Sequence, residues 1–268
     1  MREVDRLVAA VQARGIDLTQ IDPEAFVASL DAETVKAMLA PILADEERAK
    51  FNKFYDLFPD EGPLRRDLYP RHMEFFAAGK DYLERLFLAG NRCGKTVAGA
   101  YEVACHLTGL YPDWWPGKRF TRPTRGWAAG DTNETTRDII QLELFGEVIG
   151  TPDGRKTMDG SGIVPRDHLK FLPKWKSGVQ DMIDTIRVQH VSGGTSILGL
   201  KSFDQGRRSF QGTAKDFIWL DEECPIDVYG ECMMRIATTR GLLLNTFTPL
   251  KGLTDHVLQF LPQMQPNQ

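Results

Sequence analysis

The stretch Ala89–Thr96, AGNRCGKT, stands between the apolar run RLFL (85–88) and the segment TVAGAYEVACHL (96–107). A short apolar run, a glycine-containing loop and an apolar segment of helical length predict a strand, a loop and a helix in that order. In such a loop, successive backbone N–H groups wrap a phosphate, and the helix N-terminus adds a partial positive charge. The stretch therefore predicts a phosphate-binding loop within an α/β fold.

The loop residues have separate expected tasks. The residues expected to bind the nucleotide are Gly90, Asn91, Arg92, Cys93, Gly94, Lys95 and Thr96. Gly94 allows a close approach of the backbone, because a Cβ there would collide with phosphate. Lys95 would reach the β- and γ-phosphates, and the Thr96 hydroxyl would ligate Mg²⁺. The sequence departs from the GxxxxGK[ST] consensus at Ala89, where the consensus has glycine.

An acidic strand end, FIWLDEE (217–223), is the second motif. Four apolar residues followed by acids predict a buried strand that delivers carboxylates to the edge of the sheet where ligands bind. Asp221 would hold Mg²⁺, and Glu222, on the opposite face of the strand, would act as the general base. Glu223 is the alternative base if the register differs. The long interval between Lys95 and Asp221 excludes adjacent βαβ strands and favours a P-loop NTPase with one strand inserted between the two motif strands.

A third polar strand end occurs in GLLLNTFTPLKG (241–252). If this buried strand is adjacent to the acid strand, Thr246 or Thr248 would lie near the γ-phosphate, where a hydroxyl can register its loss. Further apolar runs flanked by turn signals predict more buried strands. They are GWAAG (126–130), TIRVQHV (185–191) and SILGLKSF (196–203). The fold class expected is α/β, with a mainly parallel central sheet flanked by helices.

The chain is expected to contain a helical appendage with a linker, residues 1–60, and a P-loop domain, residues 61–268. Two segments of the appendage have apolar residues at helical spacing, DRLVAAVQARG (5–15) and the stretch 31–58. Asp31, three residues before Thr34, is a candidate helix cap. We find no catalytic pattern in this region.

The composition, 42% hydrophobic and 26% charged over 268 residues, is that of a globular protein large enough to build its own core. The four cysteines form no CxxC pair, which argues against a zinc site or a disulfide framework and favours a reducing cytoplasm. No apolar run approaches the roughly 18–20 residues that span a bilayer. The N-terminal segment also lacks the apolar core of a signal peptide. We therefore expect neither export nor membrane insertion.

At this point three segments together resemble a known family. GNRCGKT, SFDQGRRSFQGTAKDFIWLDEE and LLNTFTP look like the ATPase motor of tailed-phage and prophage terminase large subunits. The resemblance covers roughly residues 65–255, and the stretch 202–223 is its most specific part. A degenerate phosphate loop that often carries arginine would account for Ala89 and Arg92.

The resemblance implies an Mg²⁺-dependent ATPase in which Lys95 and Glu222 are catalytic and Thr246 and Thr248 couple hydrolysis to motion. It also implies an arginine that stabilises the charge of the transferred phosphoryl group. The candidates for that arginine are Arg207, Arg208 and Arg92. YPRHMEFF (69–76) occupies the place of the adenine-recognition segment, where the family often offers Gln. His72 stands there in this chain, either as a base reader or as a plain surface or capping residue.

The family resemblance also implies partners, namely double-stranded DNA, the portal protein and the small terminase subunit, in the cytoplasm of an infected bacterial host. A homo-oligomeric ring on the procapsid is expected, with a monomer as the alternative for the isolated chain. Basic runs at 117–127, 154–156 and 170–176 are either contacts to DNA phosphates or solvated loops. No acid-ended strand follows Thr248, so we expect no nuclease activity from these residues.

Two other classes of function compete with this interpretation. A helicase or another nucleic-acid-remodelling ATPase would need a second motor-like domain, for which no sequence is left. A nucleotide-dependent interaction module without hydrolysis would not need the water-activating carboxylate of Glu222. DNA unwinding would distinguish the first class, and an inactive Glu222→Gln variant would argue against the second.

Overall fold

The computed structural model describes residues 31–252 and 254–261 of the chain. The chain divides into two compact units, Met1–Asn52 and Lys53–Gln268. The helix expected at 5–15 lies outside the described residues. Each unit is considered by itself below.

In the first unit, the described part is helix α3, Ala32–Phe51, which contains Pro41. Asp31 is its N-cap, and its carboxylate accepts a hydrogen bond from the Thr34 N–H at 2.8 Å, which confirms the predicted cap. The unit ends at Asn52, earlier than the predicted residue 60.

The earlier boundary has a physical reason. Phe54 stacks on Tyr101 with ring centroids 5.0 Å apart, and Phe58 meets the same ring edge-on at 5.2 Å. Both phenylalanines are buried in the core of the second unit. Phe54 and Phe58 therefore belong to the core of the second unit.

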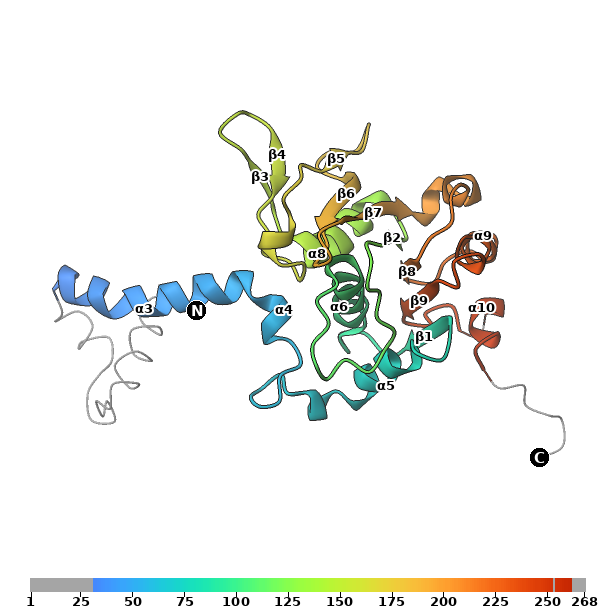
Figure 1. Cartoon of the computed structure of the whole chain (residues 1–268), viewed down its shortest axis with the longest axis horizontal. Helices are drawn as coiled ribbons and strands as arrows, with labels where there is room; N and C mark the ends of the chain where they lie inside the picture. The colour runs from blue at the N-terminus through green and yellow to red at the C-terminus, as the bar shows by residue number, and fades with distance from the viewer. Residues whose placement is uncertain (1–30, 253, 262–268) are drawn as a thin grey trace. The chain divides into compact units, whose positions relative to one another are not determined.

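The second unit is built on a seven-stranded sheet in the order β1-β9-β8-β2-β7-β6-β5 (Figure 1). Its strands are β1 Glu84–Leu88, β2 Arg125–Gly130, β5 Lys174–Trp175, β6 Ile183–Gln189, β7 Thr195–Ser202, β8 Phe217–Asp221 and β9 Leu242–Phe247. A separate two-stranded hairpin consists of β3 Val148–Gly150 and β4 Lys156–Met158. Every strand expected from an apolar run is present in the sheet.

Helices and short turns connect the strands. The α-helices are α4 Lys53–Asp56, α5 Pro70–Ala78, α6 Lys95–Thr108, α7 Asn133–Thr135, α8 Leu142–Phe145, α9 Ile226–Ala237 and α10 Asp255–Leu258. Single turns are η1 Arg66–Leu68, η3 Arg166–His168, η4 Phe203–Gln205 and η5 Arg207–Phe210, and η2 Thr136–Gln141 is a π-helix. Among the described residues, no helix is both long and apolar enough to cross a membrane.

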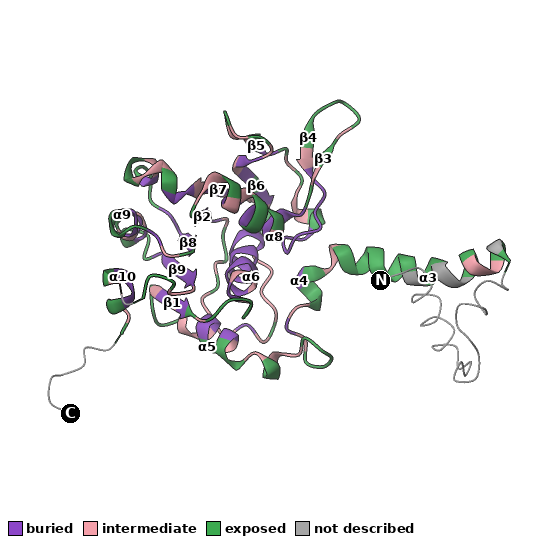
Figure 2. Ribbon diagram, turned by 180° about the vertical axis from the view of Figure 1, so that it is seen from behind, coloured by how far each residue is buried: buried purple, intermediate pink, exposed green. Residues whose placement is uncertain are grey.

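Alternating residues of β8 contribute to two separate apolar clusters. Phe217 and Trp219 belong to the cluster that contains α6, and Ile218 and Leu220 belong to the cluster that contains α9. Because successive side chains of a strand point to opposite faces, α6 and α9 cover opposite faces of the sheet. Every residue of β8 is buried, and the central strands and α6 are purple in Figure 2. Because these strands are buried on both faces of the sheet, their sequences are continuous apolar runs.

The sheet is parallel from β1 to β7 and antiparallel at β6 and β5. The prediction of a mainly parallel sheet is thus confirmed, but β6 and β7 form a hairpin. The turn between them is short and contains Gly193 with φ 91°. The two apolar runs alone did not distinguish this hairpin from a parallel pair.

A buried charged network joins α6 to β1. The Arg85 guanidinium and the Glu102 carboxylate form two hydrogen bonds, of 3.1 and 2.7 Å, and both side chains are buried. Arg85 also donates to the Phe75 carbonyl of α5 at 2.6 Å, and His106 lies 3.1 Å from the same carboxylate. The guanidinium and the imidazole hold the pKa of Glu102 below its usual value against the opposing effect of burial. The network therefore fixes α5, β1 and α6 to one another beneath the predicted P-loop.

We expect Glu102→Ala to destabilise the second unit by about 3–5 kcal/mol, because it leaves the Arg85 charge buried without a partner. Arg71→Ala is the matched control. Its ion pair with Glu74 is exposed, and such pairs contribute about 0–1 kcal/mol. Urea unfolding of both variants measures the difference. Equal losses in the free energy of unfolding of the two variants would show that the buried ion pair contributes no more than the exposed one.

Candidate active site

The carboxyl ends of β1, β9 and β8 meet at one edge of the sheet, and the predicted P-loop follows β1 there. Thr246 of β9 is in register with Phe87 of β1 on one side and with Asp221 of β8 on the other. This order confirms the expectation of one strand inserted between the two motif strands. Ligands of open α/β sheets bind at this edge. The fold thus brings together Thr96 and Asp221, which lie 125 positions apart in the sequence.

The loop before α6 has two residues in the left-handed backbone region. Gly94 has φ 74°, and a Cβ there would lie 3.0 Å from the His72 Nε2 atom. Arg92 has φ 61°, a conformation that strains a residue with a side chain and is common at functional sites. The buried Lys95 Nζ donates to the Gly90 carbonyl at 2.6 Å, while Cys93 is exposed. The lysine therefore closes the loop on itself.

Asp221 is a buried carboxylate shared by two threonines. Its Oδ1 accepts a hydrogen bond from Thr246 at 2.6 Å, and its two oxygens lie 3.2 and 3.1 Å from the Thr96 hydroxyl. Burial raises the pKa of Asp221 to about 7, although the hydrogen bonds from the two threonines oppose this shift. The carboxylate is thus held in place but lacks a full compensating positive charge.

The two glutamates after Asp221 differ in their surroundings. Glu222 is exposed with φ 100°, and partial burial raises its pKa while the Lys95 charge acts in the opposite direction. Asp131, at the end of β2, raises the pKa further. The Glu223 carboxylate instead accepts a hydrogen bond from the Thr254 hydroxyl. Of the two register alternatives, Glu223 is thus the one engaged in a side-chain hydrogen bond, while the pKa of Glu222 is influenced by the charge of Lys95.

Both threonines of the third motif contact the other two motifs. Thr246 bonds Asp221, as described, and accepts a hydrogen bond from the Trp219 indole Nε1 at 2.7 Å. The Thr248 hydroxyl donates to the Asn91 side-chain oxygen of the loop at 2.9 Å. The end of β9 is therefore bonded both to the acid strand and to the P-loop. Sequence reasoning missed Trp219, although its position two residues before Asp221 puts both side chains on one face of β8.

His72 lies in α5 beside the loop and is almost fully buried. Its Nε2 atom is 3.3 Å from the Gly94 carbonyl, and burial lowers its pKa, which favours the neutral ring. His72 was expected either to read the base or to be a plain surface or capping residue, and its burial contradicts the surface location. A cavity of about 360 Å³ adjoins it. The cavity is lined by Leu57, Phe58, Leu64, Tyr69, His72, Arg92, Cys93, Gly94 and Val97.

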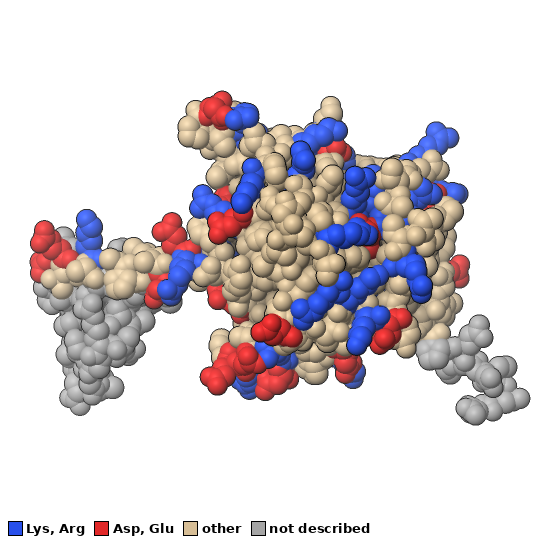
Figure 3. All heavy atoms as spheres, viewed as in Figure 1, with Lys and Arg blue, Asp and Glu red and all other residues tan. Residues whose placement is uncertain are grey.

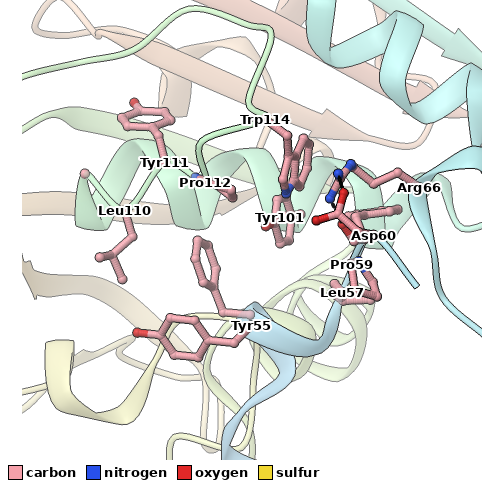
Figure 4. A pocket seen from close by; sticks show the side chains of 13 residues that line it. Tyr55, Leu57, Pro59, Asp60, Arg66, Tyr101, Leu110, Tyr111, Pro112 and Trp114 are labelled. Atoms are coloured by element: carbon pink, nitrogen blue, oxygen red, sulfur yellow. Dashed lines mark hydrogen bonds and ion pairs between the residues drawn. The ribbon is translucent and has the colours of Figure 1, made fainter. Parts of the chain in front are cut away.

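A second cavity, of about 440 Å³, has strongly aromatic walls. Tyr55, Tyr101 and Trp114 line it, and Arg66 and Asp60 form an ion pair at its rim (Figure 4). No residue of the phosphate loop contributes to its walls. This cavity is thus separate from the site at the sheet edge.

The candidate catalytic arginines lie in different environments. The Arg207 Nε donates to the Glu231 carboxylate of α9 at 3.0 Å, and Glu231 is buried. Arg208 is exposed, and Arg92 is exposed within the loop. Arg207 is therefore engaged in a structural ion pair, which sequence reasoning did not foresee.

Several side chains of the basic run at 117–127 make contacts within the fold. Arg122 forms an ion pair with Asp216 at 2.7 Å, and Lys118 donates to the Arg240 carbonyl at 2.7 Å. Arg119 donates to backbone carbonyls of the preceding turn. Lys and Arg side chains still gather across the middle of the face seen in Figure 3. The run therefore has a structural role in addition to any contact with a polyanion.

Comparison with known proteins finds a matching family and a related protein. Residues 86–267 match the family described as terminase large subunit, T4likevirus-type, N-terminal. The terminase large subunit of Salmonella phage P22 is 36% identical over 219 residues, which cover 75% of this chain and 42% of that protein. The chain thus spans less than half the length of this relative.

Two solved structures are also similar. The large terminase ATPase domain of Thermus phage P74-26 shares 19% identity with a TM-score of 0.34, covering 62% of this chain and 59% of that one. The large terminase of another thermophilic bacteriophage, in complex with ADP, shares 16% identity with a TM-score of 0.40, covering 66% of this chain and 37% of that one.

The raised pKa of Asp221 predicts a pH-dependent stability of the protein without ligands. Between the unfolded pKa, near 3.8, and the folded pKa, about 7, the folded state keeps a proton that the unfolded state has released. Stability from this group is therefore present at low pH and lost as pH rises through 7. Asp221→Asn removes the charge, so we expect it to stabilise the protein by about 1–3 kcal/mol at pH 8 and by far less at pH 5.

Urea unfolding of wild type and Asp221→Asn from pH 5 to 8.5 tests this expectation, with the exposed Asp81→Asn as the control. The control should follow the wild-type curve at every pH. A difference between wild type and Asp221→Asn that does not change with pH would contradict the assignment.

Proposed function

The chain belongs to the family of terminase large subunits, and we propose that it is the ATP-hydrolysing motor that drives double-stranded DNA into a viral procapsid. The observation that carries the proposal is the junction at Asp221, where hydroxyls from the P-loop helix and from β9 meet one buried carboxylate. Such a site would bring the phosphate-binding loop, a metal ion and the coupling strand β9 within a few ångströms of one another.

The phosphate loop would act through its backbone and Lys95. The N–H groups of residues 90–96 would surround the β-phosphate at the N-terminus of α6. The Lys95 ammonium, which now donates to the Gly90 carbonyl, would exchange that acceptor for phosphate oxygens. Such an exchange opens the loop and places a positive charge where negative charge develops during phosphoryl transfer.

The residues around Asp221 fit Mg²⁺. Asp221 and Thr96 offer carboxylate and hydroxyl oxygens, the hard donors that Mg²⁺ prefers, and they already lie within 3.2 Å of each other. No group of three or more His, Cys, Asp or Glu that could hold a metal occurs in the part of the chain that the structure describes. Phosphate oxygens and water would therefore complete the coordination. Bound there, the ion would neutralise charge on the β- and γ-phosphates.

Glu222 would be the general base for the attacking water. Its raised pKa brings its carboxylate closer to the range in which it can accept a proton at neutral pH. Glu223 is less suited to this role, because its carboxylate is bonded to Thr254. Thr246 and Thr248 would transmit the loss of the γ-phosphate to β9, since they touch Asp221 and Asn91 respectively.

The cavity beside the loop would receive the base of the nucleotide. Tyr69, Val97 and Phe58 give it apolar walls, and its volume of about 360 Å³ suits a purine ring. His72 would fasten the loop through the Gly94 carbonyl rather than read the base, because the Nε2 atom is already engaged there. ATP rather than GTP rests on the family.

Among the arginines, Arg92 would act within its own loop, and Arg208 would reach the nucleotide of a neighbouring copy in a ring. Arg207 is the weaker candidate, because its guanidinium compensates the buried charge of Glu231. The portal protein, the small terminase subunit and DNA are the partners that the family implies, and the host cytoplasm is the place where they meet. Residues 1–52 would be a contact arm for one of these partners.

Steady-state release of phosphate from ATP and Mg²⁺ tests the proposal. We expect Lys95→Ala and Glu222→Gln each to lower turnover by about 10²–10⁴-fold, because each removes charge stabilisation or water activation. Glu223→Gln is the matched control and should cost less than about tenfold. Turnover that survives the first two changes would place the site elsewhere, and a dead Glu223→Gln beside an active Glu222→Gln would exchange their roles.

A mixing experiment tests the arginines. Arg208→Ala should lower turnover by about 10³-fold without loss of stability, whereas Arg207→Ala should lower stability by only about 1 kcal/mol, because the buried Glu231 keeps its second ion pair, with Arg235 at 3.0 Å. If Arg208 acts across subunits, a mixture of Arg208→Ala and Glu222→Gln regains part of the activity that each lacks alone. A mixture as inactive as its components would refute action in a neighbouring copy.

A further inference from the structure

The indole of Trp219 ends a chain of hydrogen bonds that leads to the catalytic edge. Its Nε1 donates to the Thr246 hydroxyl at 2.7 Å, and that hydroxyl donates to the Asp221 Oδ1 at 2.6 Å. Trp219 is fully buried, Thr246 is 1% exposed and Asp221 is 5% exposed. The chain therefore runs through the interior, where water does not compete for these bonds.

The backbone and α6 together determine where this ring lies. Trp219 and Asp221 are two residues apart on β8, so both side chains project from the face that α6 covers. Gly99 of α6 provides the space, since a Cβ there would lie 2.4 Å from the indole. Thr96 precedes Gly99 by three residues and so shares its helix face, which puts its hydroxyl over Asp221. The same face of α6 thus lies against the indole of Trp219 and the carboxylate of Asp221, which are the two ends of this series of hydrogen bonds.

When Asp221 is ionised, as a metal ligand must be, the chemistry of the three groups leaves only one direction for the hydrogen bonds. An indole N–H can only donate, so the Thr246 oxygen must accept from it. The single hydroxyl proton of Thr246 is then free to donate, and the Asp221 carboxylate is the acceptor within reach. Without the indole the hydroxyl could rotate about its C–O bond. The indole therefore selects the rotamer in which Thr246 holds the carboxylate.

We propose that Trp219 is a positioning residue for the metal site: through Thr246 it fixes the Asp221 carboxylate so that its second oxygen stays beside the Thr96 hydroxyl. The inference rests on the proposed function, because it takes Asp221 and Thr96 as the residues that hold Mg²⁺. Ring packing alone would not need an indole, since phenylalanine fills most of the same space. The N–H group is the part that this role requires.

Outer partners of metal ligands commonly change metal affinity by about 10–100-fold when they are removed. The test therefore measures binding of ADP by calorimetry as a function of Mg²⁺ concentration, without any readout of turnover. Trp219→Phe keeps an aromatic ring and removes the donor. Trp115→Phe is the matched control, because Trp115 is a second buried indole whose Nε1 donates to the Lys118 carbonyl at 3.2 Å.

We expect Trp219→Phe to raise the Mg²⁺ midpoint by about tenfold, with ADP affinity in EDTA unchanged, and Trp115→Phe to leave both unchanged. The decisive comparison is a double-mutant cycle. If Trp219 acts through Thr246, Trp219→Phe adds no further shift in a Thr246→Val background. Thr246→Ser should keep the wild-type midpoint, because it retains the hydroxyl.

Two results would overturn the inference while the proposed function stands. One is a Trp219→Phe protein that binds Mg²⁺ and ADP as wild type does. The other is a Trp219→Phe shift of equal size with Thr246 and with Val at position 246, which would mean that the ring acts by packing. Wild type whose ADP affinity does not depend on Mg²⁺ would instead overturn the proposed metal site, and this inference with it.

Discussion

The burial of one carboxylate, Asp221, is the constraint on which the site depends. A charged group at 5% exposure is unfavourable unless neighbouring groups hydrogen-bond to it, and here the hydroxyls of Thr96 and Thr246 do so. These two residues come from α6 and β9, so the cost of burying the charge is offset only when helix and strands are in register. The packing of α6 and β9 that forms the sheet edge is thus the same packing that places the hydroxyls around Asp221.

Much of the fold could be predicted from the sequence, because strands buried on both faces leave a clear apolar pattern. FIWLD at 217–221 coincides with β8, and the P-loop stands between β1 and α6 as its spacing indicates. That one strand lies between the two motif strands followed from the long interval in the sequence, and the structure identifies this strand as β9. The direction of β6 did not follow from the sequence, because an apolar run carries no information on the direction of its neighbour.

The parts of the site that could not be predicted depend on single atoms. Nothing in the pattern around His72 indicates that its Nε2 lies beside the Gly94 carbonyl. The engagement of Arg207 with Glu231 depends on where η5 packs against α9, which no local signal records. The Trp219 indole likewise looks like one more core residue of an apolar strand. The residue types indicated the chemistry of the site. The contacts of these three side chains depend on three-dimensional packing, which the sequence pattern does not record.

The position of β1 at the edge of the sheet bears on how the chain is made. Among the described strands, β1 pairs with β9 alone, and the Asn245 side chain of β9 reaches the Arg85 carbonyl of β1 over 160 positions of sequence. On the ribosome, β1 leaves the exit tunnel long before β9 is synthesised. Contacts of such sequence separation form slowly, because a long loop must close first. A nascent chain that stops before residue 242 therefore carries the whole phosphate loop while β1 still has no strand to pair with.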